Sequence, residues 1–205
     1  MAIDTLFKVE NSVGRPKSYD HEQVLKKAMI QFWQSGYAET SLSDLETATS
    51  LNRYSLYKGF GDKEALFEMA LDYYQQHIIS RMLAPLIELP PSLESLKAYF
   101  QQLNILLKGR FGKFGCLYQN SQKEGISQNE RVKQHGINLW LQQHRLFSAC
   151  LDDKDCQLPF DKEDAVQLLL AQTQAQISLA RSQVPIKVLD AQCQGIQSLI
   201  STWHR

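Results

Sequence analysis

The segment from Thr40 to Leu66 constrains the fold of this chain more than any other part of the sequence. Ser41 is suited to cap the start of a short helix, with Asp44 three positions later completing a capping box. Asn52 is suited to cap a second short helix after a turn. These signals predict two short helices joined by a tight turn, followed by the start of a third.

The preceding segment predicts a supporting helix. Asp20 is placed to cap its start together with Gln23, and Gly36 offers a left-handed stop at its end. Apolar residues recur between them at helical spacing, namely Val24, Leu25, Ala28, Met29 and Phe32. Such a stripe is typical of a core-facing helix, so we expect Trp33 to pack rather than to stack on bases.

The helix that begins near Arg53 has the position of a recognition helix, which lies in a DNA major groove. Arg53 and Tyr54 stand at its exposed start and are candidates for contacts with base edges. An arginine is favoured there because its planar fork matches the two acceptors of guanine.

The order of residues in this segment resembles the DNA-binding domain of the TetR family of one-component transcriptional regulators. That family has Thr at the start of the second helix, then a hydrophobic and an acidic residue, Ala or Gly around the turn, and finally Leu-Tyr-x-x-Phe-x-x-Lys-x-x-Leu. The matching residues are Thr40, Leu42, Asp44, Leu45, Ala48, Leu51, Leu56, Tyr57, Phe60, Lys63 and Leu66. The chain departs from the pattern at Ser50, Tyr54 and Gly59, so the resemblance implies no particular operator sequence.

The resemblance implies phosphate contacts by Thr40, Tyr57 and Lys63, and it implies that the basic arm around Arg15 and Lys17 lies along DNA. The alternatives are that Thr40 caps the second helix, that Tyr57 is a half-buried core residue and that Lys63 is a solvated lysine. For the arm around Arg15 and Lys17, the alternative is a disordered tail. The full set expected to bind double-stranded DNA is Arg15, Lys17, Thr40, Ser41, Asn52, Arg53, Tyr54, Tyr57, Lys58 and Lys63.

Net charge gives no support for DNA binding, because residues 1–63 carry eight basic and eight acidic side chains. Binding therefore requires that the basic groups gather on one face. We expect a modest number of phosphate contacts and a strong dependence on salt.

Length and composition predict an all-α protein of two parts. The chain has 205 residues, of which 43% are hydrophobic, which is enough to bury a substantial core. We expect a flexible basic arm over 1–18, a helix-turn-helix domain over 19–62 and a helical sensor and dimerisation domain over 63–205. Further helices are predicted from Asp62 to the Pro85 region, and over 93–108, 116–123, 129–150, 161–183 and 186–203. No apolar run approaches the ~20 residues of a membrane span and no signal peptide is evident, so a cytoplasmic protein with no membrane partner is expected.

The last two predicted helices carry a second signal. Leu189, Cys193, Ile196, Ile200 and Trp203 recur at helical intervals on the final helix, and Ala171, Ala175, Ser178 and Ser182 form a strip of small residues on the helix before it. Two such helices per subunit can form a four-helix bundle in a homodimer, although part of the apolar stripe must face the subunit's own core. The resembled family forms its dimer with this pair, which would place two recognition helices ~34–36 Å apart.

The middle of the second domain is rich in aromatic residues of the kind that line small-molecule pockets. The candidates for binding an inducer of unknown identity are Tyr99, Phe100, Phe114, Cys116, Tyr118, Trp140, His144 and Phe147, with Phe111 nearby. An aromatic stripe is more often core than pocket, and His144 has the alternative of a packing histidine. The resemblance implies an inducer cavity in this domain.

Cys116 offers an alternative trigger. It follows a Gly-rich segment and is predicted to begin a helix, where the helix dipole and the nearby Arg110 and Lys113 would favour the thiolate. A Gly-Cys pair here resembles a subset of the family in which the cysteine responds to oxidants or electrophiles. The alternative is a buried, inert cysteine. The four cysteines lack the spacing of a zinc site, so no metal is expected.

Three classes of function were compared. The leading one is a transcriptional regulator, a repressor that a ligand or a modified thiol releases from its operator. An enzyme is disfavoured because no HExxH, P-loop or nucleophile-elbow motif is present, and no cofactor is expected. A helical adaptor that binds protein through the same basic helix is the third class.

Overall fold

The structure is a computed structural model that describes residues 19–204. Within that range the chain is helical and contains no β-strand, as the all-α prediction required; Cys156 and His204 form an isolated bridge. None of these helices combines the length and the apolar character needed to cross a membrane.

The N-terminal unit contains α1 (His21–Ser35), α2 (Leu42–Thr49) and α3 (Arg53–Phe60). The predicted caps are observed. Asp20 accepts hydrogen bonds from the backbone of α1, Ser41 and Asp44 form a reciprocal capping box on α2, and Asn52 accepts from the Ser55 N–H at 2.9 Å on α3. These contacts satisfy backbone donors that have no partner within their own helix, and they fix where each helix begins.

A long helical rod continues from this unit into the rest of the molecule. It consists of α4 (Lys63–Tyr74), a π-helical turn η1 (Gln75–Ile79) and α5 (Ser80–Glu88). Pro85 lies inside α5, and the rod ends at Glu88, close to the end that was predicted in the Pro85 region. The rod was predicted as a single helix, and the π-turn within it was not predicted.

The rod completes the core of the N-terminal unit. Phe32 of α1 meets Phe67 of α4 edge to face, with ring centroids 4.9 Å apart. Trp33 meets Tyr74 in the same manner at 5.0 Å, and it donates from Nε1 to the Gly115 carbonyl at 3.0 Å. The prediction that Trp33 packs is therefore confirmed.

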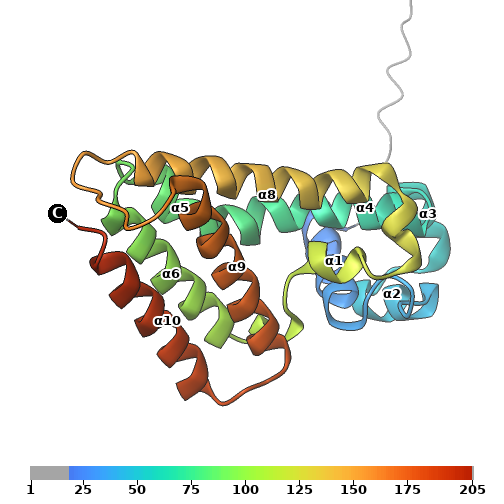
Figure 1. The fold of residues 1–205 in the computed structure, drawn as a ribbon. Coiled ribbons are helices and arrows are strands. Elements are labelled where there is room, and N and C mark those ends of the chain that lie inside the picture. The colour runs from blue at the N-terminus through green and yellow to red at the C-terminus, as the bar shows by residue number, and fades with distance from the viewer. Residues whose placement is uncertain (1–18, 205) are drawn as a thin grey trace, which may run out of the picture.

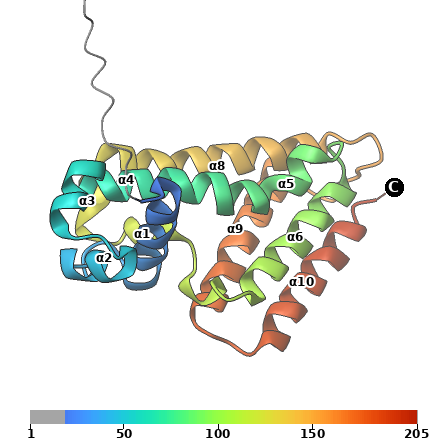
Figure 2. The same ribbon diagram turned by 180° about the vertical axis from the view of Figure 1, so that it is seen from behind.

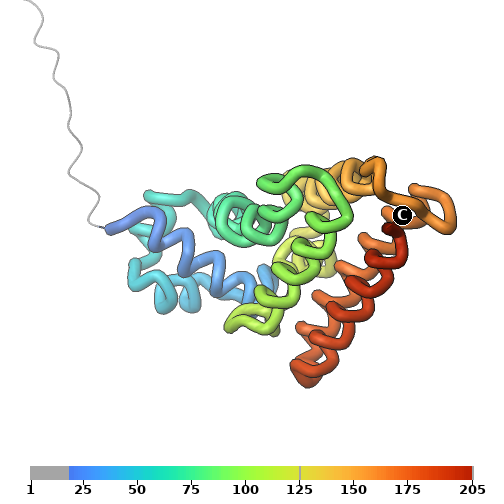
Figure 3. Tube along the Cα trace, turned by 90° about the vertical axis from the view of Figure 1, so that its left-hand side faces the viewer, coloured from blue at the N-terminus to red at the C-terminus, as the bar shows by residue number. Residues whose placement is uncertain are grey.

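The larger helical part contains α6 (Leu93–Lys108), α7 (Leu117–Ser121), α8 (Glu130–Leu151), α9 (Lys162–Arg181) and α10 (Ile186–Ser201), with short 3₁₀ turns η2 (Gly112–Phe114) and η3 (Gly125–Gln128). Figures 1 and 2 show α8 lying along the rod of α4 and α5, while α6, α9 and α10 project to one side as a packed group. Figure 3 shows α1 to α3 gathered at the opposite end of the molecule from α10. The predicted helices of this part are all present, with ends that differ by a few residues.

Candidate nucleic-acid interface and internal cavity

The outer face of α3 is open to solvent at one end of the molecule (Figures 1 and 2). Tyr54 is 71% exposed and Tyr57 is 44% exposed, while Arg53 and Lys58 are also exposed. The ammonium of Lys58 lies 5.8 Å from the centre of the Tyr54 ring. Four side chains with cationic or hydrogen-bonding groups therefore share one accessible helix face.

The opposite face of α3 anchors it. Leu56 and Phe60 are buried, each with 3% of its surface exposed. The Glu46 carboxylate of α2 accepts from the Arg53 backbone N–H at 2.5 Å, so α2 also holds the start of α3. The Arg53 guanidinium itself makes no hydrogen bond or ion pair within residues 19–204. A fixed backbone thus presents an unpaired cation at the helix start.

The Thr40 side chain is part of the protein core and does not lie on the surface. It is fully buried, and its hydroxyl donates to the Gly36 carbonyl at 2.5 Å. The predicted phosphate contact through the Thr40 side chain is therefore wrong for this conformation, because the hydroxyl is already paired and has no access to solvent. Ser41 is exposed, but its hydroxyl both donates to and accepts from Asp44. The hydrogen bonds that the Ser41 hydroxyl and backbone N–H donate to the Asp44 carboxylate lower the pKa of that carboxyl.

Lys63 is only partly exposed at the start of α4. Its ammonium lies 4.3 Å from the centre of the Tyr37 ring. Burial lowers the pKa of Lys63, although the carboxylates of Glu124 and Glu39 partly offset that shift. The alternative interpretation of Lys63 as a fully solvated lysine is therefore not supported, because its side chain is partly buried.

Glu124, from the segment between α7 and η3, reaches the N-terminal unit. Its carboxylate accepts from the Ala38 backbone N–H at 2.7 Å, in the turn before α2. Gly36 has a φ of 90°, and a Cβ built on it would lie 2.7 Å from a Glu124 carboxylate oxygen. The positive φ and the close approach of Glu124 both favour glycine at position 36.

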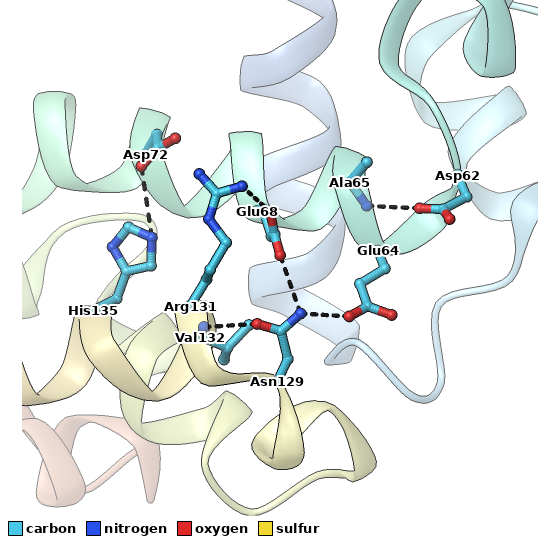
Figure 4. A network of polar contacts seen from close by, with 9 residues as sticks. All are labelled: Asp62, Glu64, Ala65, Glu68, Asp72, Asn129, Arg131, Val132 and His135. Carbon is cyan, nitrogen blue, oxygen red and sulfur yellow. Dashed lines mark hydrogen bonds and ion pairs between the residues drawn. The ribbon is translucent and has the colours of Figure 1, made fainter.

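A second link joins the start of α8 to α4 (Figure 4). Asn129 donates to Glu64 and, at 3.0 Å, to Glu68. The Arg131 guanidinium forms an ion pair with Glu68 at 2.6 Å, and the His135 ring lies 3.5 Å from the Asp72 carboxylate. Polar contacts thus hold α8 against the first helical half of the rod.

A cavity of about 520 Å³ lies between α1, the π-turn, α6 and the Gly109–Cys116 segment. A neighbouring cavity of about 460 Å³ runs along α8. Both cavities are lined by the same five residues at their junction, namely Cys116, Gln119, Leu139, Gln143 and Gln174. The two cavities therefore adjoin one another.

Three of the predicted ligand-binding residues line these cavities. Cys116 lines both, and Tyr118 and Trp140 line the second. Phe111, which the sequence analysis placed nearby, lines the first.

The other five predicted ligand-binding residues do not line either cavity. Tyr99, Phe100 and Phe147 pack against one another in the core with no exposed surface. Phe114 packs on Trp33, and His144 pairs with Glu163 at 3.0 Å. The prediction was wrong for Tyr99, Phe100 and Phe147 because an aromatic stripe that reaches the centre of a helical domain is filled by its own neighbours. It was wrong for Phe114 and His144 because these partly buried side chains contact Trp33 and Glu163 instead.

The sequence analysis missed the polar residues of the cavity junction. Gln119 donates to Gln174, and Gln143 is buried with only 1% of its surface exposed. Glutamines are common on exposed helix faces, so no local pattern singles these out.

Cys116 lies in a different environment from the one expected. It is 4% exposed and lies beside Tyr74. Burial raises the pKa of the Cys116 thiol, and hydrogen bonds from the backbone of Gln119, from Tyr74 and from the backbone of Tyr118 only partly oppose this. The expectation of a favoured thiolate is therefore wrong, because desolvation of the anion outweighs the short helix α7.

The N-terminal unit is recognisable beyond this chain. Residues 24–70 match the family model described as bacterial regulatory proteins, tetR family. The chain is thus similar to the tetR family over these residues. The match begins within α1 and ends within α4, so it contains α2 and α3 in full.

The sequence is similar to two HTH-type transcriptional regulators. The HTH-type transcriptional repressor ComR of Escherichia coli (strain K12) is 38% identical over 122 residues, which cover 59% of this chain and 58% of ComR. The uncharacterized HTH-type transcriptional regulator YezE of Bacillus subtilis (strain 168) is 32% identical over 125 residues, covering 60% of this chain and 63% of YezE. The similarity thus spans less than two thirds of either relative.

The similarity of fold extends further. A cysteine mutant of the TetR family transcriptional regulator CifR, complexed with 26-base-pair double-stranded operator DNA, superposes with a TM-score of 0.78 at 25% identity, covering 90% of this chain and 98% of that one. The reduced form of Escherichia coli NemR gives a TM-score of 0.71 at 18% identity, covering 86% of this chain and 94% of that one, which shows a shared fold.

The residues predicted to form the tetR-family dimer interface are exposed on α9 but buried on α10. The small residues of α9 and of its C-cap are all exposed, namely Ala171, Ala175, Ser178 and Ser182. The apolar residues of α10 and the following Trp203 are buried within the subunit, with 0–5% of their surfaces exposed: Leu189, Cys193, Ile196, Ile200 and Trp203. Their assignment to the dimer interface is therefore corrected, because they pack into the subunit's own core. Small and polar residues form the exposed face of α10, including Ala191, Gln194, Gly195 and Ser198.

The predicted DNA-binding residues Arg15 and Lys17 lie outside the described residues.

Proposed function

We propose that this protein is a dimeric transcriptional repressor that binds a double-stranded DNA operator and is released from it by a small-molecule inducer. Such a protein acts where DNA is, in the cytoplasm. The fold similarity to an operator-bound regulator supports the proposal, as does the sequence similarity to a repressor.

The exposed face of α3 carries this proposal. The Arg53 guanidinium has no partner within the described part of the chain, and Tyr54, Tyr57 and Lys58 lie beside it. An arginine at the start of a recognition helix can donate two hydrogen bonds to a guanine, and tyrosine hydroxyls and lysines bind phosphates. The dimer would form through the exposed strip of α9 and the exposed face of α10.

A mobility-shift experiment with DNA from upstream of the gene tests the proposal. We expect a retarded complex whose affinity falls steeply with added salt. Arg53→Ala should weaken specific binding by ~10-fold or more, since a bidentate arginine contributes ~1–3 kcal/mol of base discrimination. Lys154→Ala, a change of an exposed lysine between α8 and α9, should leave binding unchanged. Equal affinity of the wild type for all DNA sequences would contradict the proposal.

Cys116 supports a second trigger for the same repressor. The thiol lines both cavities, so an electrophile small enough to enter them would meet it. The raised pKa of the thiol opposes rapid reaction. If this trigger operates, an electrophile will release wild-type protein from DNA but not Cys116→Ser. Equal release of both would leave the inducer as the trigger.

A further inference from the structure

A chain of hydrogen bonds ends at the junction of the two cavities. Gln143 donates from Nε2 to the Tyr99 hydroxyl at 2.8 Å, and the Tyr99 hydroxyl lies 3.3 Å from the Thr173 hydroxyl. Thr173 in turn donates to the Leu169 carbonyl at 3.0 Å. Tyr99, Gln143 and Thr173 are each at most 1% exposed, so water does not compete for these groups.

The Leu169 carbonyl fixes the direction of every hydrogen bond in this chain. A backbone carbonyl can only accept, so the Thr173 hydroxyl donates its single hydrogen to it. Tyr99 must then donate to the Thr173 oxygen, and the Tyr99 oxygen must accept from Gln143. The amide nitrogen of Gln143 therefore faces Tyr99, and the reverse orientation would leave two donors or two acceptors facing each other.

The carbonyl oxygen of Gln143 is consequently an acceptor at the cavity junction. It makes no hydrogen bond within residues 19–204, although the side chain lines both cavities. The oxygen is open to the cavity, so a ligand that fills this space would displace water from it. Such a ligand would leave the acceptor unpaired, at a cost in binding free energy, unless it donates a hydrogen bond. Gln119 and Gln174 also line the junction, but they bond to each other and are more exposed.

The charge of that donor is set by the rest of the lining. Neither cavity has an aspartate or a glutamate among its lining residues, whereas Lys26, Arg81 and Arg110 line the larger one and Lys133 lines the smaller one. An ammonium group at Gln143 would be buried without a counter-ion and among cations, which is strongly unfavourable. A neutral hydroxyl avoids this cost.

We infer that the cavity takes a neutral alcohol or phenol with an apolar body, whose hydroxyl donates to the Gln143 carbonyl. This inference rests on the proposal that the cavity holds the inducer. The apolar body lies among Met29, Trp33 and Ile177 in the larger cavity. An ether or a ketone of the same size lacks the donor and leaves the Gln143 oxygen unpaired.

Calorimetric titration of the full chain without DNA tests the inference with three probes: 2-naphthol, 2-methoxynaphthalene and 2-naphthylmethylamine. We expect 2-naphthol to bind ~10-fold more tightly than its methyl ether, the effect of leaving a buried acceptor unpaired. The protonated amine should bind more weakly still. Equal binding of naphthol and ether, tightest binding of the amine, or no binding of any probe would each overturn the inference.

Two variants separate the hydrogen bond from simple packing. Gln143→Leu should remove the preference for naphthol, whereas Gln142→Leu on the same helix should keep it, because Gln142 lines neither cavity. Tyr99→Phe frees the amide to turn, so its N–H can face the cavity and the ether should bind as well as the naphthol. An undiminished preference in both Gln143→Leu and Tyr99→Phe would overturn the inference. Operator binding measured without probes reports on the proposed function separately.

Discussion

Burial decides the protonation of the side chains around the cavity. It raises the pKa of Tyr74 and of the Cys116 thiol, and it lowers the pKa of His135, which stacks on Tyr118. Neutral forms are therefore favoured in this region.

His135 makes folding sensitive to acid. Burial lowers its pKa in the folded state more than Asp72 and Glu68 raise it, and Arg131 adds to the lowering. Since the unfolded chain then binds a proton more readily, stability should fall as pH drops through the ordinary histidine range of ~6.5. Urea unfolding at about pH 7.5 and about pH 5.5 should show a smaller loss of stability on acidification for His135→Asn than for wild type. An identical loss in both proteins would contradict this.

The residues of the α3 surface could be predicted from sequence because local signals specify them. Asn52 caps the helix, and Leu56 and Phe60 bury its inner face, so the exposed positions follow from helical geometry. Gln143 and Tyr99 could not be assigned in the same way. Their roles depend on which of three long helices supplies each neighbour, and that is a property of packing.

At the scale of elements, the turn between α2 and α3 holds a residue in an unfavourable conformation. Ser50 ends α2 with a φ of 62° and a ψ of 24°, and its N–H donates to Glu46. A left-handed conformation costs a non-glycine residue ~1–2 kcal/mol, whereas glycine adopts it freely. Ser50→Gly should therefore raise the free energy of unfolding by up to ~1 kcal/mol in urea titrations. Ser43→Gly, inside α2, should lower it by ~0.5–1 kcal/mol.

The contact between α4 and α8 depends strongly on Glu68. This carboxylate accepts from both Asn129 and Arg131, and its side chain is 17% exposed. Glu68→Ala should lower the free energy of unfolding by ~1–2 kcal/mol, because it removes the acceptor of Arg131 and one of the two acceptors of Asn129. Glu130→Ala is the matched control, since that exposed carboxylate only approaches Lys133, at 3.5 Å. Equal stability of the two variants would show that the α4 to α8 link is not supported by Glu68.

Helix positions were predictable because caps and breaks are local. The π-turn η1 was not, since its residues continue the helical pattern on either side. The reach of Glu124 to Ala38 was also not predictable, because 86 positions separate them in the chain.

At the scale of the whole molecule, the salt dependence of operator binding should count the phosphate contacts. Lys58 is exposed on α3, and each phosphate contact releases about one counterion. Lys58→Ala should reduce the slope of log K against log salt by ~1. An unchanged slope would remove Lys58 from the phosphate-binding set.

The assembly should depend on the small residues of α9. Ala175 is exposed in the single subunit, and a long charged side chain there would keep a second helix from approaching. Ala175→Arg should therefore sediment as a monomer under conditions where the wild type is a dimer. Gln34→Arg, on the exposed side of α1, should not change the mass of the assembly. A dimer in both variants would place the interface elsewhere.

The rod formed by α4 and α5 belongs to both the N-terminal unit and the larger helical part. Phe67 and Tyr74 of α4 cover the aromatic faces of Phe32 and Trp33 in α1. A fragment that ends at Asp62 would therefore lack the α4 side chains that cover its hydrophobic core. The smallest stable N-terminal fragment must extend through α4. Exchanging the N-terminal unit between relatives should therefore give a folded chimaera only when the junction between the two sequences lies beyond Tyr74.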